Sequence, residues 1–276
     1  MSRLKATFTA LGNRNKAALV VFITAGDPEP DVTVPLMHAL VNAGADIVEL
    51  GIPFSDPMAD GPVIQAASER ALVAGTGTGS VLHIVRTFRE QDDLTPVVLM
   101  GYLNPIEVMG YAEFTSAFAG AGIDGIIVVD MPPEEGAELN TVLTEYGIDN
   151  IPVLAPTSTP ERVKLICNDA RGFIYYVSLR GVTGSANLDP GEVRTRLTDI
   201  RSETDLPLGV GFGIDNPDTA SKIAEFADAV IVGSAVVRIV ADNTDNVEEL
   251  IRKASDFVST LSTAVEQTQR GMSATT

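Results

Sequence analysis

Short runs of hydrophobic, mostly β-branched residues recur along the chain, separated by stretches with the spacing of amphipathic helices. Eight runs can be distinguished, at residues 18–24, 46–52, 96–102, 125–131, 151–157, 173–179, 206–212 and 229–235. Most are hydrophobic at nearly every position, which is typical of parallel strands covered by helices. The stretches between them, such as 31–44 and 112–122, end on glycine, a common helix terminator. The pattern predicts a strand–helix unit that is repeated along the chain.

Eight such units within about 250 residues indicate a (β/α)8 TIM barrel. Residues 1–264 are expected to form this single domain, which begins with an extra N-terminal helix, and residues 265–276 a frayed tail. The interval 53–95 is long enough for a proline-rich loop and two helices. The alternative is an open doubly wound sheet, but the glycine fingerprint that usually follows its first strand is missing after residue 24. We therefore expect the barrel.

The composition limits the kinds of partner that this protein can bind. Of 276 residues, 45% are hydrophobic, and the formal net charge is −18. A surface this negative repels nucleic-acid backbones and anionic lipids, and no hydrophobic run approaches the roughly 18 residues of a membrane span. Cys167 is the only cysteine, so no disulfide can form within the chain, which fits a reducing compartment. We expect a cytoplasmic protein that binds neither nucleic acid nor membrane.

A carboxylate, Glu49, lies near the end of the second predicted strand. Alternate strand residues share a face, so Glu49 should point into the barrel together with Ile47 and Gly51. Active sites of these barrels lie at the C-terminal ends of the strands. A carboxyl group held there away from bulk water should have a raised pKa, which suits proton transfer near neutral pH. A structural glutamate bound by a cation or amide is the alternative, but the other predicted strands contain no Lys or Arg.

Other titratable residues exclude some chemistries. Position alone makes Asp60, in the loop after this strand, a residue at a helix N-terminus. No lysine ends a predicted strand, so a Schiff-base aldolase lacks its amine. The only histidines, His38 and His83, fall in helical stretches, so a metal-assisted aldolase lacks its ligands and no metal site is predicted. Carboxylate acid–base chemistry remains.

Glycines gather at three successive predicted strand ends, in residues 181–185, 211–213 and 233–234. Barrels of this kind commonly hold phosphate with loops after strands seven and eight and with the N-terminus of a short extra helix, which would follow strand eight here. Backbone amides could then bind phosphate with little help from cationic side chains. The candidate phosphate ligands are Gly184, Ser185, Gly211, Gly213, Gly233 and Ser234. An apolar part of the substrate would meet Phe22, Met100, Tyr102, Ile127, Val129, Val153, Tyr175, Phe212 and Val232.

Six stretches together resemble the family of tryptophan synthase α subunits. They are VELGIPFSDPMADGPVIQ (48–65), GYLNPI (101–106), DMPPEE (130–135), YVSLRGVTG (176–184), GVGFGI (209–214) and VIVGSAVV (230–237). The resemblance implies a carbon–carbon lyase of tryptophan biosynthesis that cleaves indole-3-glycerol phosphate to indole and glyceraldehyde 3-phosphate. It implies that Glu49 is the acid–base catalyst and Asp60 its partner at the indole nitrogen. Thr183 would belong to the indole pocket and reach Asp60 when the loops close.

The resemblance also implies a partner, the β subunit, in an α2β2 heterotetramer. The β subunit would receive the indole and carry pyridoxal phosphate, whereas this chain would hold no cofactor. The interface would include Asp56, Asn104, Pro105, Asp130 and Pro132. In one departure, Leu179 stands where many relatives have arginine, which bears on loop closure and not on the catalytic pair. Two alternatives are a catalytically silent phosphosugar-binding subunit and a stand-alone lyase that releases indole.

Overall fold

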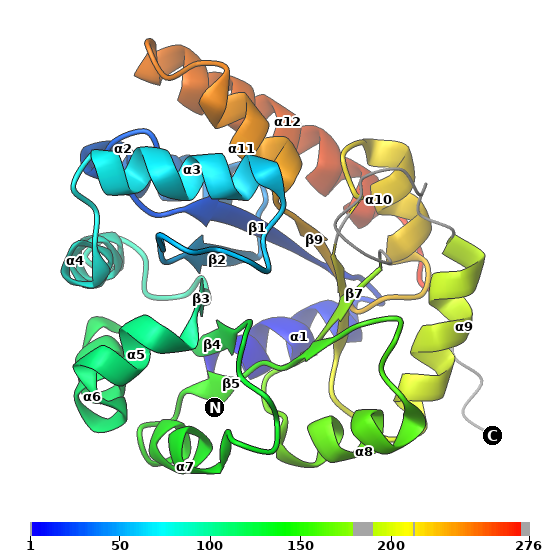
Figure 1. The fold of residues 1–276 in the computed structure, drawn as a ribbon. Coiled ribbons are helices and arrows are strands. Elements are labelled where there is room, and N and C mark those ends of the chain that lie inside the picture. The colour runs from blue at the N-terminus through cyan, green and yellow to red at the C-terminus, as the bar shows by residue number, and fades with distance from the viewer. Residues whose placement is uncertain (1, 179–189, 212, 272–276) are drawn as a thin grey trace.

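A curled sheet of parallel strands lies at the centre of the molecule (Figure 1). This computed structural model describes residues 2–178, 190–211 and 213–271, and within them the sheet has nine strands. They are β1 (Ala18–Thr24), β2 (Ile47–Gly51), β3 (Val97–Gly101), β4 (Gly125–Val128), β5 (Asp149–Asn150), β6 (Val153–Leu154), β7 (Ile174–Val177), β8 (Leu208–Gly211) and β9 (Ala229–Val232). The hydrogen-bonded order is β5-β4-β3-β2-β1-β9-β8-β7-β6. Its two ends, β5 and β6, are adjacent in the chain, so the sheet closes and the predicted barrel is confirmed.

Helices surround this sheet (Figure 1). In the described residues they are α1 (Arg3–Asn13), α2 (Pro30–Asn42), α3 (Pro62–Val73), α4 (Thr78–Arg89), α5 (Leu103–Met109), α6 (Tyr111–Ala121), α7 (Ala137–Glu145), α8 (Pro160–Asp169), α9 (Pro190–Arg201), α10 (Pro217–Ala224), α11 (Ser234–Ala241) and α12 (Val247–Gln267). The predicted N-terminal helix, the two helices after β2 and the short helix after the last strand are all present. No helix in these ranges is long and apolar enough to span a membrane.

The fifth predicted strand, 151–157, is the one that the structure breaks. Only Val153 and Leu154 of this run form a strand, β6, which pairs with β7, whereas β5 begins two residues before the run and pairs with β4. Pro152 lies between β5 and β6 and has no N–H to donate to a neighbouring strand. Ile151 still donates to the Ile126 carbonyl oxygen at 2.9 Å, after which the chain leaves β4. The barrel wall is therefore joined at this point by the covalent chain rather than by a continuous ladder.

Two hydrophobic layers follow from the alternation of strand residues. Ile47 belongs to the cluster inside the barrel, into which α1 also inserts Leu4. Val48 and Leu50 belong to the cluster between the strands and the outer helices. Alternate residues of a strand share a face, so Glu49 lies on the same face as Ile47 and points into the barrel, as the sequence predicts.

The C-terminal residues contact the rest of the chain beyond residue 265, where the sequence predicts a frayed tail. Helix α12 continues to Gln267, and residues 268–271 still make hydrogen bonds. Lys16 Nζ donates to the Thr268 carbonyl oxygen at 3.2 Å, and Gly271 donates its N–H to the Glu225 carbonyl oxygen at 2.8 Å. Residues 265–271 therefore pack against the barrel.

Candidate active site

Glu49 is an enclosed carboxyl group, and no cationic side chain of the described residues stabilises its charge. Its exposed fraction is 1%, and its Oε2 atom has no hydrogen-bond partner among the described residues. Burial, and secondarily the negative charge of Asp60, raise the pKa of Glu49 from 4.5 to about 8. Desolvation of this kind favours the neutral form of an acid. Glu49 therefore holds a proton at neutral pH, as expected from its predicted position.

Asp60 lies in the loop that joins β2 to α3 and is buried as well. Gly61 is the N-cap residue of α3, so Asp60 is not a capping residue and its carboxyl group is available for other contacts. Tyr102 Oη donates to Asp60 Oδ2 at 3.0 Å, and the Ala59 N–H donates to the same Tyr102 oxygen at 3.0 Å. Burial raises the pKa of Asp60 to about 6, against the lowering effect of the Tyr102 hydrogen bond. Asp60 is therefore mostly ionised at pH 7, where Glu49 is mostly protonated.

Tyr102 fixes the loop that carries Asp60. Its exposed fraction is 4%, and its ring stacks on Phe54 with the ring centroids 5.0 Å apart. Burial and the neighbouring Asp60 charge raise the pKa of Tyr102, so the phenol stays protonated and can donate. The sequence placed Tyr102 in the apolar pocket, whereas its hydroxyl group binds the loop.

Both carboxyl groups open into one cavity of about 340 Å³ at the C-terminal ends of the strands. Of the predicted apolar residues, Phe22, Met100 and Tyr175 line it. Burial, together with the charges of Glu49 and Asp60, raises the pKa of Tyr175 well above 10, so its phenol is neutral and protonated. The cavity therefore combines an apolar wall with two carboxyl groups in different protonation states.

Three of the residues predicted to bind phosphate lie at the same cavity. Gly213, Gly233 and Ser234 line the same cavity, and α11 begins at Ser234. Gly213 has φ +75°, a backbone conformation that L side chains rarely adopt. Gly211 has a different role, because a Cβ atom there would lie 2.2 Å from Tyr175 Oη. The predicted phosphate ligands Gly184 and Ser185 lie outside the described residues, as do Thr183 and Phe212 of the predicted indole pocket and Leu179.

The strand alternation corrects two of the apolar predictions. Val232 packs in the outer cluster between the sheet and the helices, and its neighbour Ile231 lines the cavity instead. Ile127 is buried in the inner cluster of the barrel, below the cavity lining. Because the side-chain period of a strand is two, a shift of one residue moves a side chain to the opposite face.

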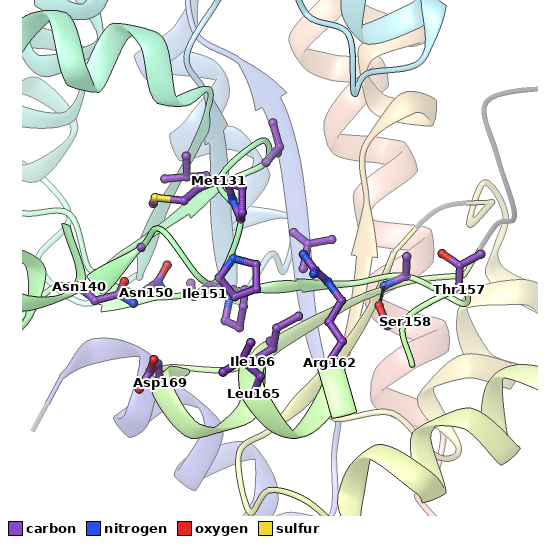
Figure 2. Close-up of a pocket in the computed structure, with 18 residues that line it drawn as sticks. Met131, Asn140, Asn150, Ile151, Thr157, Ser158, Arg162, Leu165, Ile166 and Asp169 are labelled. Carbon is purple, nitrogen blue, oxygen red and sulfur yellow. Dashed lines mark hydrogen bonds between the residues drawn. The ribbon is translucent and has the colours of Figure 1, made fainter. Parts of the chain in front are cut away.

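Val129 and Val153 line a second cavity, of about 360 Å³, rather than the catalytic one. It lies where the strand is broken at Pro152, between the end of β4 and helix α8. Figure 2 shows Asn140 and Asn150 at one end of it and Thr157 and Ser158 at the other, with Arg162 in between. Among the described residues, the two cavities share no lining side chain.

The predicted partner surface lies in the loops and the helix that follow β2, β3 and β4. Asp56 and Asn104 are exposed, and Pro105 and Pro132 are half-buried. Asp130 Oδ1 accepts a hydrogen bond from the Leu103 N–H at 2.8 Å, which ties the loop after β4 to the start of α5. Two large apolar side chains of the same surface are exposed, Met58 at 78% and Val108 at 81%.

Sequence reasoning missed two charged residues of the cavity that Glu49 and Asp60 line. Arg238 of α11 lines it, together with the exposed Asp215. The position of Arg238 could have been predicted from the sequence, because it comes four residues after Ser234 and thus lies on the same face of the helix. In the described part of the chain, no cluster of His, Cys, Asp and Glu side chains could hold a metal ion.

Known proteins resemble this chain along nearly its whole length. Residues 8–266 match the family model described as tryptophan synthase alpha chain. The tryptophan synthase alpha chain of Thioalkalivibrio sulfidiphilus is 55% identical over 96% of this chain and 100% of that relative, and that of Methylococcus capsulatus is 54% identical with the same coverage. The solved tryptophan synthase subunit alpha of Legionella pneumophila has a TM-score of 0.90 at 42% identity, covering 96% of this chain and 99% of that one. Tryptophan synthase of M. tuberculosis, in its aminoacrylate-bound form, has a TM-score of 0.85 at 33% identity, with 96% and 100% covered.

Proposed function

Because this chain belongs to the tryptophan synthase alpha chain family, we propose that Glu49 and Asp60 perform the acid–base chemistry of that family's reaction. The enzyme is a carbon–carbon lyase that cleaves indole-3-glycerol phosphate to indole and glyceraldehyde 3-phosphate in tryptophan biosynthesis. The observation that supports the two roles is the pair of carboxyl groups in one cavity. Their pKa values, about 8 and about 6, give them opposite protonation states at neutral pH.

Glu49 acts first as an acid and then as a base. Its carboxyl proton goes to the indole ring carbon that bears the side chain, and the ring nitrogen becomes cationic. The resulting Glu49 carboxylate then removes the proton of the adjacent side-chain hydroxyl group. The carbon–carbon bond breaks, the aldehyde forms, and the bonding electrons return to the ring. Glu49 ends with the proton that it needs for the next turnover, so one group performs both transfers.

Asp60 stabilises the cationic intermediate. An ionised carboxylate beside the ring nitrogen lowers the energy of a positive charge that develops there, and it can accept the N–H proton and return it. The hydrogen bond from Tyr102 keeps Asp60 oriented and lowers its pKa. The low exposure of Asp60, 5%, strengthens this electrostatic effect.

The two ends of the substrate have separate binding regions. The indole ring is placed against Phe22, Met100 and Tyr175, and the phosphate at the backbone amides around Gly213, Gly233 and Ser234. A helix N-terminus offers unpaired N–H groups and a partial positive charge, which suits a phosphate group. Gly184 and Ser185 from the sequence prediction would complete the phosphate region.

The partner is proposed to be a tryptophan synthase β subunit in an α2β2 assembly, with the pyridoxal phosphate in that subunit. The exposed loops after β2, β3 and β4, with Met58 and Val108 at their surface, support a protein partner there. Indole formed in the catalytic cavity would pass through this face. Cys167, a free buried thiol, fits the reducing cytoplasm where the assembly would act.

The assignment is tested by steady-state indole formation from indole-3-glycerol phosphate, with and without a β subunit. We expect both Glu49→Gln and Asp60→Asn to lower the rate about a hundredfold or more, because neither amide can transfer the proton or carry the charge. Glu248→Gln, an exposed carboxyl group at the start of α12, serves as the control and should keep the wild-type rate. A well-folded Glu49→Gln enzyme with near wild-type activity would refute the catalytic role.

A further inference from the structure

Arg238 is the only cationic side chain that lines the catalytic cavity in the part of the chain that the structure describes. We propose that Arg238 binds the phosphate group of the substrate and makes the enzyme selective for the phosphorylated form. This inference rests on the proposed function of the same cavity. It adds a side-chain cation to a phosphate region that the sequence assigned to backbone amides.

The position of Arg238 on α11 directs it toward the phosphate region. The helix begins at Ser234, and Arg238 follows one turn later on the same face. Long helical side chains lean back toward the N-terminus and cover the preceding turn. The guanidinium of Arg238 can therefore reach the side of the cavity on which the unpaired N–H groups at Gly233 and Ser234 lie.

The guanidinium of Arg238 is free to bind an anion. It is exposed and has no hydrogen bond or ion pair with any described side chain. Other arginines of the chain are paired with carboxylates, for example Arg70 with Asp27 at 2.8 Å and Arg194 with Glu225 at 2.8 Å. The N–H donors of Arg238 therefore form no hydrogen bond that stabilises the described fold.

The charges around the cavity show why a cation is needed. A phosphate monoester carries about −1.5 to −2 at pH 7, whereas a helix N-terminus offers only about half a positive charge. Two acidic side chains besides Glu49 line the cavity, Asp60 and Asp215, and the whole chain has a net charge of −18. Each of these repels the substrate phosphate. Arg238 adds one full positive charge where the phosphate binds, and its planar fork of N–H donors matches phosphate oxygens.

Binding to the phosphate rather than to the reacting atoms has a specific kinetic consequence. Loss of a uniform binding interaction raises KM and leaves kcat unchanged. A hydrogen bond to a charged group of this kind corresponds to roughly a tenfold change in affinity. The effect should be absent for indole-3-glycerol, which lacks the phosphate, and should shrink with ionic strength because the guanidinium is exposed.

The test compares Arg238→Gln with Arg238→Lys and with Arg86→Gln, which removes an equally exposed arginine from α4 on the outside of the barrel. Three quantities are measured for each protein: the Kd of inorganic phosphate by isothermal titration calorimetry, and the KM and kcat for indole-3-glycerol phosphate. We expect Arg238→Gln to raise Kd and KM about tenfold at low salt with unchanged kcat. The Kd and KM of Arg238→Lys should lie between those of wild type and Arg238→Gln, and those of Arg86→Gln should equal the wild-type values.

Wild-type values of Kd and KM in Arg238→Gln, or an equal loss in Arg86→Gln, would overturn the role of Arg238 while leaving the proposed function intact. An equal loss of kcat/KM for indole-3-glycerol and for its phosphate would also overturn it, because the effect would then not involve the phosphate. If wild type neither binds inorganic phosphate nor cleaves the phosphorylated substrate, the proposed function fails, and this inference fails with it.

Discussion

Replacement of Glu49 by glutamine should stabilise the fold at high pH while it abolishes catalysis. The pKa of Glu49 rises from 4.5 to about 8 on folding, because the folded chain buries the group. Between these pH values the folded state keeps the proton that the unfolded chain has lost. The free energy of unfolding of the wild type therefore falls as the pH rises from 4.5 to 8, and no further Glu49 contribution is lost above that range. Below pH 4.5 both states are protonated at this site.

The size of the effect follows from the same pKa difference. At 1.36 kcal/mol per pKa unit, the rise from 4.5 to about 8 corresponds to at most about 5 kcal/mol. Glutamine does not titrate, so any cost of its buried amide is the same at every pH. The difference in stability between Glu49→Gln and wild type should therefore grow in favour of the variant from pH 5 to pH 9. Asp46 and Asp60 also have raised pKa values, but they are present in both proteins.

The assay is urea unfolding followed by far-ultraviolet circular dichroism, at pH values from 5 to 9, for wild type, Glu49→Gln and the exposed control Glu248→Gln. We expect a gain of several kcal/mol in Glu49→Gln between the two ends of this range. The free energy of unfolding of Glu248→Gln should change with pH in the same way as that of wild type. A pH-independent difference between Glu49→Gln and wild type would show that the Glu49 pKa is not raised by folding, and the reasoning would fail.

Three further results are expected. Tyr102→Phe removes the hydrogen bond to Asp60, so the pKa of Asp60 should rise. The acid limb of the pH profile of kcat/KM should then move to higher pH, with activity at pH 6 about tenfold lower. An acid limb at the wild-type position would contradict this. Gly213→Val places a side chain at φ +75° beside the phosphate region and should raise KM about tenfold or more, whereas Gly79→Ala, where a Cβ atom has free space, should leave KM unchanged. Thr183→Val, titrated with a β subunit, should assemble normally but turn over more slowly than wild type when saturated, because the sequence prediction gives this hydroxyl group the role of reaching Asp60 when the loops close. Equal saturated rates would exclude that role.

The barrel could be predicted because the hydrophobic pattern of each strand is local and recurs along the chain. Each hydrophobic run needs only its own residues to indicate a covered parallel strand, and the inward direction of Glu49 follows from the alternation in β2. The break at Pro152 was also present in the sequence, since proline cannot donate to a ladder, but a short hydrophobic run does not show where pairing stops. Which alternate residues of a strand face inward is settled by its tertiary contacts, and in β9 they turn Ile231 rather than Val232 toward the cavity.

The parts of the site that the sequence left open depend on long-range contacts. Asp60 is separated from Tyr102 by 42 positions, and only the folded barrel brings the two side chains within 3.0 Å. The fixed position of residues 265–271 likewise depends on Lys16, at the other end of the chain. Arg238 was overlooked because its hydrophobic neighbours on α11 made the segment look like an ordinary amphipathic helix. Its role becomes visible only when the cavity and the charges around it are known.

The central claim is that Glu49 holds a proton at neutral pH and can deliver it to the substrate. A carbon-13 NMR titration of the glutamate carboxyl carbons measures this directly, with the Glu49 signal assigned by its absence from the Glu49→Gln spectrum. The structure predicts a titration midpoint near pH 8, so that the group is largely protonated at pH 7. A midpoint at or below the ordinary glutamate value of 4.5 would leave Glu49 ionised at pH 7 and would contradict its role as the acid.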